Sequence, residues 1–119
     1  MLIKYDLRGN NVVSQSVTAT YSGVLTVEYV NGTDQALMVI KNPEIGRKNF
    51  TEIICSFSFF DGQGTSAVCS NANTTGFFDI TKYEIVDDTV TMNATFEMIM
   101  GGGQFVVKNG SLTDLNFTI

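Results

Sequence analysis

Apolar and polar residues alternate along the C-terminal part of the chain, from Phe77 to Val107. Because successive side chains of a strand point to opposite faces, this period of two predicts an antiparallel sheet with one buried face and one wet face. Two strands, Phe77–Val86 and Thr89–Met100, are expected to pair across a two-residue turn at Asp87-Asp88. The expected cross-strand partners are Ile85 with Val90, Tyr83 with Met92, Glu84 with Thr91 and Lys82 with Asn93.

The alternation slips near the C-terminus. A tight hairpin turn at Asn109-Gly110 would place Asp114 opposite Phe105, whereas the alternate residues from Leu115 onward are apolar. Either a β-bulge near Leu112–Asp114 restores the pattern, or Asn109-Gly110 is not a simple turn. Before this point, the expected partners across a turn at Gly102-Gly103 are Met100 with Phe105 and Met98 with Val107.

Turn residues divide the rest of the chain into short apolar runs, and no segment has sustained helical periodicity. At 119 residues the chain is a single domain, residues 1–119, with room for its own core. We expect an all-β fold, an antiparallel β-sandwich of about 8–10 short strands in mostly meander order. A β-barrel is the alternative, but the loop Asn42–Asn49 interrupts the meander and favours the sandwich. The expected strands are Leu2–Tyr5, Val12–Tyr21, Val24–Val30, Gln35–Lys41, Phe50–Phe60, Thr65–Ser70, Phe77–Val86, Thr89–Met100, Gln104–Lys108 and Leu112–Ile119.

Charge and hydropathy narrow the classes of function. The chain has 7 basic and 12 acidic residues, a net charge of −5, and its Lys and Arg residues do not cluster. Such a surface repels phosphate backbones, so no nucleic-acid partner is expected. No stretch reaches the roughly 18 apolar residues that a membrane helix needs, so no transmembrane segment is expected. The start, Met1–Asp6, lacks the pattern of a signal peptide.

Groups that commonly catalyse reactions are scarce. The sequence contains no histidine, which removes Ser-His and Cys-His nucleophile pairs. Its carboxylates fall on predicted turns and wet strand faces, where solvated charges are ordinary. The run Gly101-Gly102-Gly103 joins two strands without a following helix, so it is expected to be a turn and not a phosphate loop. We expect no enzyme, no cofactor and no metal site; a pair of acidic residues assembled from distant segments is the alternative.

Two cysteines, Cys55 and Cys69, flank the turn Asp61–Gly64 almost symmetrically. A three-residue loop centred on Gly62 would place them opposite each other, so a cross-strand disulfide is geometrically allowed and would imply an oxidising compartment. The alternative is two free thiols that act as small core residues, because Cys55 shares a strand face with Phe57.

The tripeptide Asn-x-Ser/Thr occurs six times. In a secreted protein such sites accept N-linked glycans on exposed loops. The alternative is that asparagine marks turns and threonine fills strand faces, so that the two residues often meet. The candidate glycosylation sites are Asn31, Asn49, Asn73, Asn93, Asn109 and Asn116.

Some apolar side chains fall outside the expected core. In Phe59-Phe60 and in Phe77-Phe78, one ring must leave the face that its neighbour occupies. Ile99 and Val106 form another apolar pair on the expected wet face. Phe60 and Phe78 either line a second core layer or form an apolar surface patch that recruits a partner. Together with Ile99 and Val106 they predict an interaction surface for a protein partner or for self-assembly. The candidates are Phe60, Phe78, Ile99 and Val106.

Residues 76–115 resemble a known type of domain. The segment Gly76-Phe77-Phe78-Asp79-Ile80-Thr81-Lys82-Tyr83, followed by Val90–Met98 and Phe105–Leu112, is similar to small Bacteroidetes-type surface lipoprotein β-domains of unknown function. Asn93-Ala94 stands where that family has Ser-Gly. The resemblance implies an antiparallel β-domain outside the cytoplasm, and it transfers no catalytic or ligand-binding residue.

We hypothesise a non-enzymatic structural or interaction module, displayed on a surface or forming a subunit of an extracellular or virion assembly. The terminal strands Leu2–Tyr5 and Leu115–Ile119 are expected to be able to complete a neighbour's sheet. The alternative is a small-ligand or glycan-binding β-sandwich with its site in loops such as Asn42–Asn49 and Asn71–Thr75. The expected location is extracytoplasmic.

Overall fold

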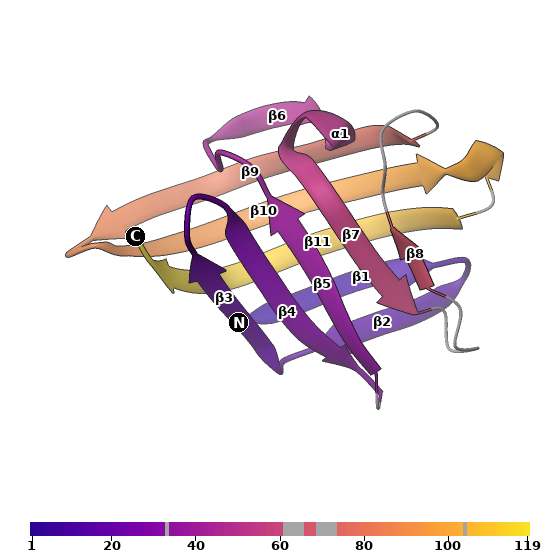
Figure 1. Ribbon diagram of the computed structural model, residues 1–119, viewed down its shortest axis with the longest axis horizontal. Helices are drawn as coiled ribbons and strands as arrows, with labels where there is room; N and C mark the ends of the chain where they lie inside the picture. The colour runs from indigo at the N-terminus through magenta and orange to yellow at the C-terminus, as the bar shows by residue number, and fades with distance from the viewer. Residues whose placement is uncertain (33, 61–65, 69–73, 104) are drawn as a thin grey trace.

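The computed structural model describes residues 1–32, 34–60, 66–68, 74–103 and 105–119. Within these ranges the chain forms two antiparallel sheets that pack face to face, with strands that cross obliquely (Figure 1). The expected all-β sandwich is therefore confirmed, and the sheets do not close into a barrel. We name them the long sheet and the short sheet.

The long sheet has the strand order β2-β1-β11-β10-β9-β6, and the short sheet has the order β3-β4-β5-β7-β8. The strands of the long sheet are β1 (Leu2–Leu7), β2 (Asn10–Ser14), β6 (Gly46–Asn49), β9 (Thr74–Val86), β10 (Thr89–Met100) and β11 (Phe105–Thr118). Those of the short sheet are β3 (Val17–Tyr21), β4 (Leu25–Asn31), β5 (Asp34–Ile40), β7 (Ile54–Phe60) and β8 (Ser66–Val68). A helical turn, α1 (Phe50–Ile53), precedes β7, and η2 (Gly101–Gly103) joins β10 to β11.

The register of β9 against β10 near their turn is the predicted one. All four expected pairs form, from Ile85 with Val90 to Lys82 with Asn93. Asp87 and Asp88 have φ angles of 50° and 66°. Two consecutive residues with positive φ make this a type I′ turn, whose twist matches that of the flanking strands.

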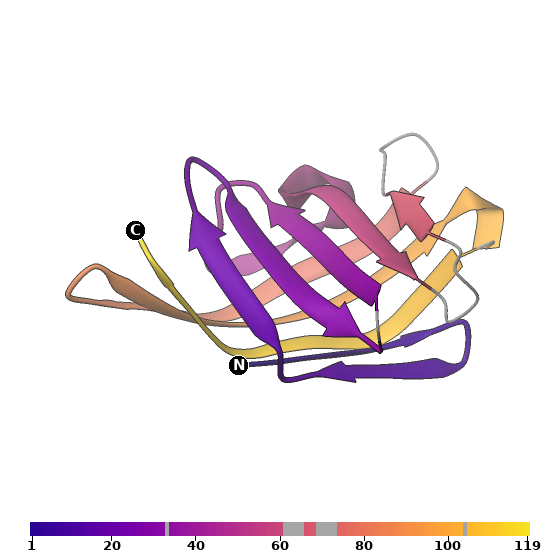
Figure 2. The ribbon, with the colours of Figure 1, turned by 60° about the horizontal axis from the view of Figure 1, so that its bottom comes forward.

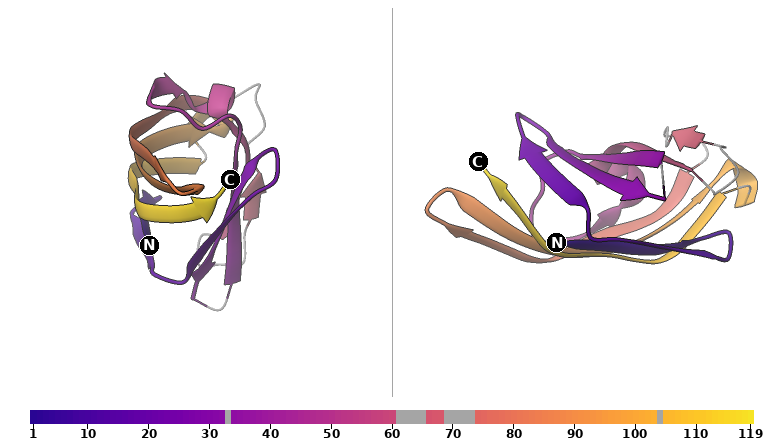
Figure 3. Two further views of the ribbon diagram at one scale, coloured as in Figure 1. Left: turned by 90° about the vertical axis from the view of Figure 1, so that its left-hand side faces the viewer. Right: turned by 90° about the horizontal axis from the view of Figure 1, so that it is seen from below.

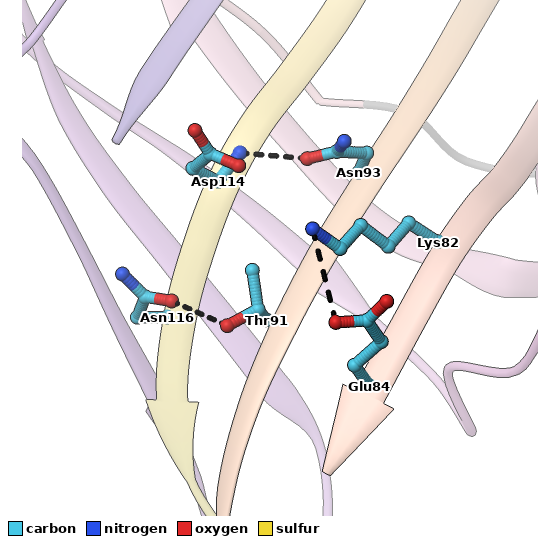
Figure 4. Close-up of polar contacts among 6 residues, drawn as sticks. All are labelled: Lys82, Glu84, Thr91, Asn93, Asp114 and Asn116. Atoms are coloured by element: carbon cyan, nitrogen blue, oxygen red, sulfur yellow. Dashed lines mark hydrogen bonds and ion pairs between the residues drawn. The ribbon is translucent and has the colours of Figure 1, made fainter. Parts of the chain in front are cut away.

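Opposite Asn93, strand β11 carries one extra residue, which is the bulge that the sequence predicts near Leu112–Asp114. Asp114 has a φ of 51°, and its backbone N–H donates to Oδ1 of Asn93 at 2.7 Å (Figure 4). Further along the same face, the Thr91 hydroxyl donates to Oδ1 of Asn116 at 2.9 Å. The Asn93 side chain therefore accepts a hydrogen bond from the backbone of the bulge, and the Asn116 side chain accepts one from Thr91 on the neighbouring strand.

A second extra residue in β11 lies opposite Glu97. Asn109 has a φ of 54°, and its side-chain amide donates to Oδ2 of Asp6 on β1 at 3.0 Å. Asn109-Gly110 is therefore not a hairpin turn, which was one of the two alternatives, and the two strands expected around it form one strand, β11. An asparagine with positive φ followed by glycine suits a bulge as well as a turn, so the residue types alone did not separate the two.

The terminal strands lie inside the long sheet. β1 pairs with β2 on one side and with β11 on the other, and β11 also pairs with β10. The hypothesis of strand addition is wrong for Leu2–Tyr5, because β1 has a partner on each side. The pairs of β1 with β11 end at Thr113, so for Leu115–Ile119 strand addition stays a prediction.

Three other elements differ from the predictions. The expected strand Val12–Tyr21 divides at a corner, where the chain leaves the long sheet for the short one and the Ser16 N–H donates to Oγ of buried Ser14 at 3.2 Å. The beginning of the expected strand Phe50–Phe60 is helical, because Phe50 and Ile53 are both buried. A spacing of three residues brings two side chains to one face in a helix and to opposite faces in a strand. Part of the expected loop Asn42–Asn49 is the edge strand β6.

Aromatic rings fill the core between the sheets. The Tyr5 ring on β1 contacts Tyr29, Phe57 and Phe96, with ring centroids 5.7 to 6.2 Å apart. Among the described side chains, no buried nitrogen or oxygen atom lacks a hydrogen-bond partner. The core therefore offers no unpaired polar group for a buried ligand.

Candidate interaction surface

The long sheet reaches beyond the short sheet along the longest dimension of the molecule, which is 41 Å. Strands β9, β10 and β11 have 13, 12 and 14 residues, whereas the described strands of the short sheet have between 3 and 7. At about 3.3 Å per residue, a strand of that length spans the whole molecule. The β9–β10 hairpin consequently projects past β3 at one end (Figure 2; Figure 3, right).

Burial decreases along β9 toward this end. Phe78 and Ile80 are buried, Tyr83 is half-buried, and Ile85 is 54% exposed although it lies on the same face as Tyr83. The reason is that the short sheet ends before it can cover Ile85. We call the exposed apolar group at this end the tip surface. Its residues are Tyr21, Tyr83, Ile85, Val86 and Ile119.

Two tyrosines of the tip surface, one from each sheet, contact the same core ring, that of Phe117. The Tyr21 ring stacks on the ring of Phe117, with centroids 6.1 Å apart and planes at 22°. The Tyr83 ring, on β9, lies 6.3 Å from Phe117, which is two strands away on β11. Burial, and to a smaller degree the nearby Tyr21, raises the pKa of Tyr83. Phe117 is itself buried and belongs to the core, whereas the residues of the tip surface around it are exposed or half-buried.

The tip is acidic. Glu84, Asp87 and Asp88 are exposed on residues 82–88, and the one base in that segment, Lys82, lies 3.8 Å from Glu84 (Figure 4). The segment therefore has a net charge of −2, from three carboxylates and one ammonium group. A partner of this surface would combine apolar side chains with positive charge.

The opposite end of the long sheet holds the predicted pair Ile99 and Val106. They face each other in the register of β10 and β11, with Ile99 44% exposed and Val106 half-buried. Next to Val106 is a hollow of about 390 Å³, which we call the end hollow. Its lining residues are Asp6, Arg8, Gly9, Val106 and Lys108.

The end hollow has the opposite charge. The Arg8 guanidinium lies 5.6 Å from the centre of the Phe105 ring, and Lys108 is exposed. The carboxylate of Asp6 accepts a hydrogen bond from the Asn109 amide, as described above. Two bases against one acid give the lining of the hollow a charge of +1. Glu97, whose carboxylate accepts a hydrogen bond from the Asn109 N–H at 3.4 Å, is not among the lining residues.

Phe78 does not belong to an interaction surface, which corrects the prediction. The register of β9 against β10 shifts between Asn93 and Ala94, so β9 carries an extra residue at Thr81 and the side-chain directions before it are inverted. Phe78 is therefore fully buried, and Phe77 lies on the outer face with the Arg47 guanidinium 3.8 Å from its ring centre. The Phe60 side chain lies outside the described part of the structure.

Cys55 is exposed, so its interpretation as a core residue is wrong. It is the extra residue of a bulge in β7, since Val39 pairs with Ser56 and Ile40 with Ile54. Its thiol lies 3.6 Å from the carbonyl oxygen of Val39. The predicted disulfide partner, Cys69, lies outside the described residues, and the disulfide stays a prediction.

The candidate glycosylation sites have different surroundings. Asn49, Asn109 and Asn116 are exposed, and the Asn49 amide donates to Oε1 of Glu52 at 2.6 Å. Asn93 is half-buried and held by the bulge of β11. The Asn31 side chain and the whole of Asn73 lie outside the described part, and glycosylation stays a prediction.

The alternative hypothesis, a site for a small ligand or a glycan, requires a cavity with suitable lining residues. At the corner between β2 and β3, a cavity of about 310 Å³ is lined by Gln15, Thr18, Glu28, Tyr29 and Gln35, among others. Tyr29 is its one aromatic lining residue, and that ring is buried in the core, so a sugar ring has no open aromatic face to stack on there.

Among the described residues there is neither a cluster of metal-ligating side chains nor a membrane-spanning helix. No three His, Cys, Asp or Glu side chains come close enough to hold a metal ion. Nor does any helix of the described chain have the length and apolar character to cross a membrane. Of the loops proposed for a ligand, Asn42–Asn49 is tied by an ion pair between Glu44 and Lys48 at 2.6 Å, and most of Asn71–Thr75 lies outside the description.

Comparisons of the chain with models of protein families, with curated proteins and with solved structures find no match in any of the three. The resemblance of residues 76–115 to surface lipoprotein domains therefore stays a prediction.

The tip surface was missed by the sequence reasoning, which assigned Tyr83 and Ile85 to the core because they alternate with polar residues. One signal was present. The two strands of that hairpin were expected to be longer than most of the other strands, and a second sheet of shorter strands cannot cover their whole length.

Proposed function

We propose that the chain is a non-enzymatic protein-interaction module whose contact region is the tip surface. The setting that we propose is extracellular, on a surface or in a larger assembly, as the sequence resemblance implies. The proposal assigns no catalytic role to the tip surface, whose carboxylates are exposed to solvent.

The observation that carries the proposal is the exposure of Ile85, Val86 and Ile119 around one end of the long sheet, where they are 54%, 68% and 48% exposed. Ile85 and Val86 are successive strand residues and point to opposite faces, so the apolar side chains surround the end of the hairpin. Burying an apolar side chain of this size is favourable by about 1.5–3 kcal/mol. Grouped apolar side chains on a soluble domain mark contact sites for other proteins. The border of tyrosines fits this use, because Tyr is enriched at protein interfaces.

A random-peptide library displayed on phage tests the proposal. Peptides selected on the wild-type chain are then measured against Ile85→Asp and against a matched control, Ile45→Asp. Ile45 is 59% exposed and lies between β5 and β6; the next residue, Gly46, pairs with Ile80, five residues before Ile85 on β9. Both variants replace one exposed isoleucine by the same charge.

We expect selected peptides that combine apolar residues with Lys or Arg, and at least about a tenfold loss of affinity for Ile85→Asp. Affinity for Ile45→Asp should match that of the wild type. Urea unfolding should show nearly equal stability for all three chains, since exposed positions change stability by about 0.5 kcal/mol or less. Peptides that depend on Ile45, on neither residue, or the absence of any selected peptide would contradict the proposal.

A further inference from the structure

The two ends of the long sheet are complementary in shape and in charge. One end is a projecting hairpin with the turn Asp87-Asp88 at its extremity, and the other end holds the end hollow beside the turn between β1 and β2 (Figure 1; Figure 3, right). The views agree that the β9–β10 turn and the β1–β2 turn lie near opposite ends of the longest axis, and Arg8 and Gly9 of the second turn line the hollow. One copy therefore presents the projection and the hollow in opposite directions.

The chemistry of the two ends also matches. The turn presents two carboxylates with exposed Val86 beside them, and the hollow presents Arg8 and Lys108 beside Val106. Exposed Ile99 continues the apolar part of the hollow, since it pairs with Val106 across the strands. A carboxylate turn entering this hollow would meet positive charge around an apolar contact.

We infer that the partner of the tip is a second copy of this chain, with Asp87 and Asp88 of one copy seated in the Arg8–Lys108 hollow of the next. This inference rests on the proposed function, because it names the partner of the same surface. The hollow of about 390 Å³ is at the lower end of the range of binding pockets, about 300–1,000 Å³, and suits a two-residue turn.

A contact between two different patches of the same chain is heterologous. It closes only if the rotation between copies brings the last copy back to the first, and otherwise it forms an open chain of copies. Because the two patches lie at opposite ends of one axis, we expect open, linear growth. A contact of this kind is small, and the net charge of −5 on each copy opposes it, so association should be weak and concentration-dependent.

Charge complementarity favours this occupant over an unrelated protein. The tip requires a partner with apolar side chains and positive charge, and the end hollow has both on the same small area. Within the chain, the charges of residues 82–88 and of the hollow lining have opposite signs, −2 and +1 as counted above.

Reciprocal charge reversal tests the inference. One variant reverses the tip, Asp87→Lys/Asp88→Lys, and another reverses the hollow, Arg8→Asp/Lys108→Glu. Average molar mass is measured by sedimentation velocity and light scattering up to millimolar concentration, for each chain alone and for the two variants mixed. The matched control is Glu28→Lys/Glu44→Lys, which changes the charge by the same amount on exposed residues away from both ends.

We expect the mass of the wild type to rise above 13.0 kDa with concentration and to continue past the dimer. Each reversed variant alone should stay monomeric, and their mixture should associate again. The control should associate at least as strongly as the wild type, because it lowers the magnitude of the net charge from −5 to −1. Because lysine is strained in a turn with positive φ, circular dichroism checks the fold, and Asp87→Asn/Asp88→Gly removes the charges while keeping the turn. That variant should also associate less.

Three results would overturn the inference. They are a wild type that stays monomeric throughout, association that neither reversal changes, and reversed variants that do not associate when mixed. Peptide selection on the tip would be unaffected by any of these results, so a failure here is distinct from a failure of the proposed function.

Discussion

The hydroxyl of Tyr5, on the long sheet, lies 2.7 Å from the hydroxyl of Tyr29, on the short sheet. Both tyrosines are buried, and their rings meet edge to face with planes at 84°. Each hydroxyl therefore has its partner inside the core, and the hydrogen bond joins the two sheets. The pair costs little as long as both members are present.

Removing both hydroxyls should destabilise the fold less than the two single removals taken together. Tyr5→Phe leaves the Tyr29 hydroxyl buried without a partner, which costs about 1–3 kcal/mol, and Tyr29→Phe does the same to Tyr5. We expect the double variant to lose less free energy of unfolding than the sum of the single losses. Urea unfolding of the four chains measures this coupling. Additive losses would show that the two hydroxyls act independently.

Stability should fall steeply in alkali. Burial raises the pKa of Tyr5 to about 12, and it raises the pKa of Tyr29 further. In the unfolded chain both ionise near pH 10, so above that pH the unfolded state binds fewer protons and is favoured. Each tyrosine should lower the free energy of unfolding by about 1.4 kcal/mol per pH unit between pH 10 and 12. Urea unfolding across this range checks the slope, and Tyr5→Phe/Tyr29→Phe should show a flatter one.

Gly76 and Gly46 should respond differently to alanine. Their φ angles are similar, 133° and 128°, and unfavourable for other residues. A Cβ at Gly76 would overlap the backbone carbonyl of Glu97, whereas one at Gly46 would meet no described atom within 4 Å. Gly46→Ala should cost only the backbone strain, about 1–2 kcal/mol, and Gly76→Ala should cost at least 1–3 kcal/mol more, by the estimate for overpacking. Equal losses in thermal unfolding would contradict this difference.

A different pair of residues in the turn at the tip should increase the stability of the fold. Asp87 and Asp88 occupy positions where Asn-Gly is the preferred pair, and two adjacent carboxylates repel each other. Asp87→Asn/Asp88→Gly should raise the free energy of unfolding by about 1 kcal/mol, the cost of one strained residue. Asp88→Ala, which removes a charge and keeps a Cβ, should give no comparable gain in urea unfolding. An equal gain would assign the effect to charge alone.

The pairing of Ile85 with Val90 could be predicted because a two-residue turn and strict alternation fix the register between them. The direction of Phe78 could not, since one extra residue at Thr81 inverts every side chain before it. Cys55 was misplaced for the same reason. A bulge leaves little trace in the sequence unless it has a residue with positive φ, as Asn109 and Asp114 have in β11.

The exposure of the tip surface depends on how the two sheets cross, and not on the residues of β9 alone. Alternation shows which side chains share a face of β9, but the cover over that face comes from strands that cross it from the other sheet. Where β3 ends relative to Ile85 follows from the crossing of the sheets and from the corner after Ser14. Neither can be read from local patterns, so the end of the core could not be predicted.

The length of the projecting hairpin sets how far the tip lies from the rest of the molecule. Adding one residue to each strand would lengthen its reach by about 3.4 Å but turn the apolar side outward, so a change that keeps the same face must come in steps of two residues per strand, about 7 Å. Such steps leave the interior untouched, because they lie beyond the last strand that covers the sheet. If the tip of one copy is seated in the hollow of the next, as we infer, hairpin length alone would set the spacing between copies.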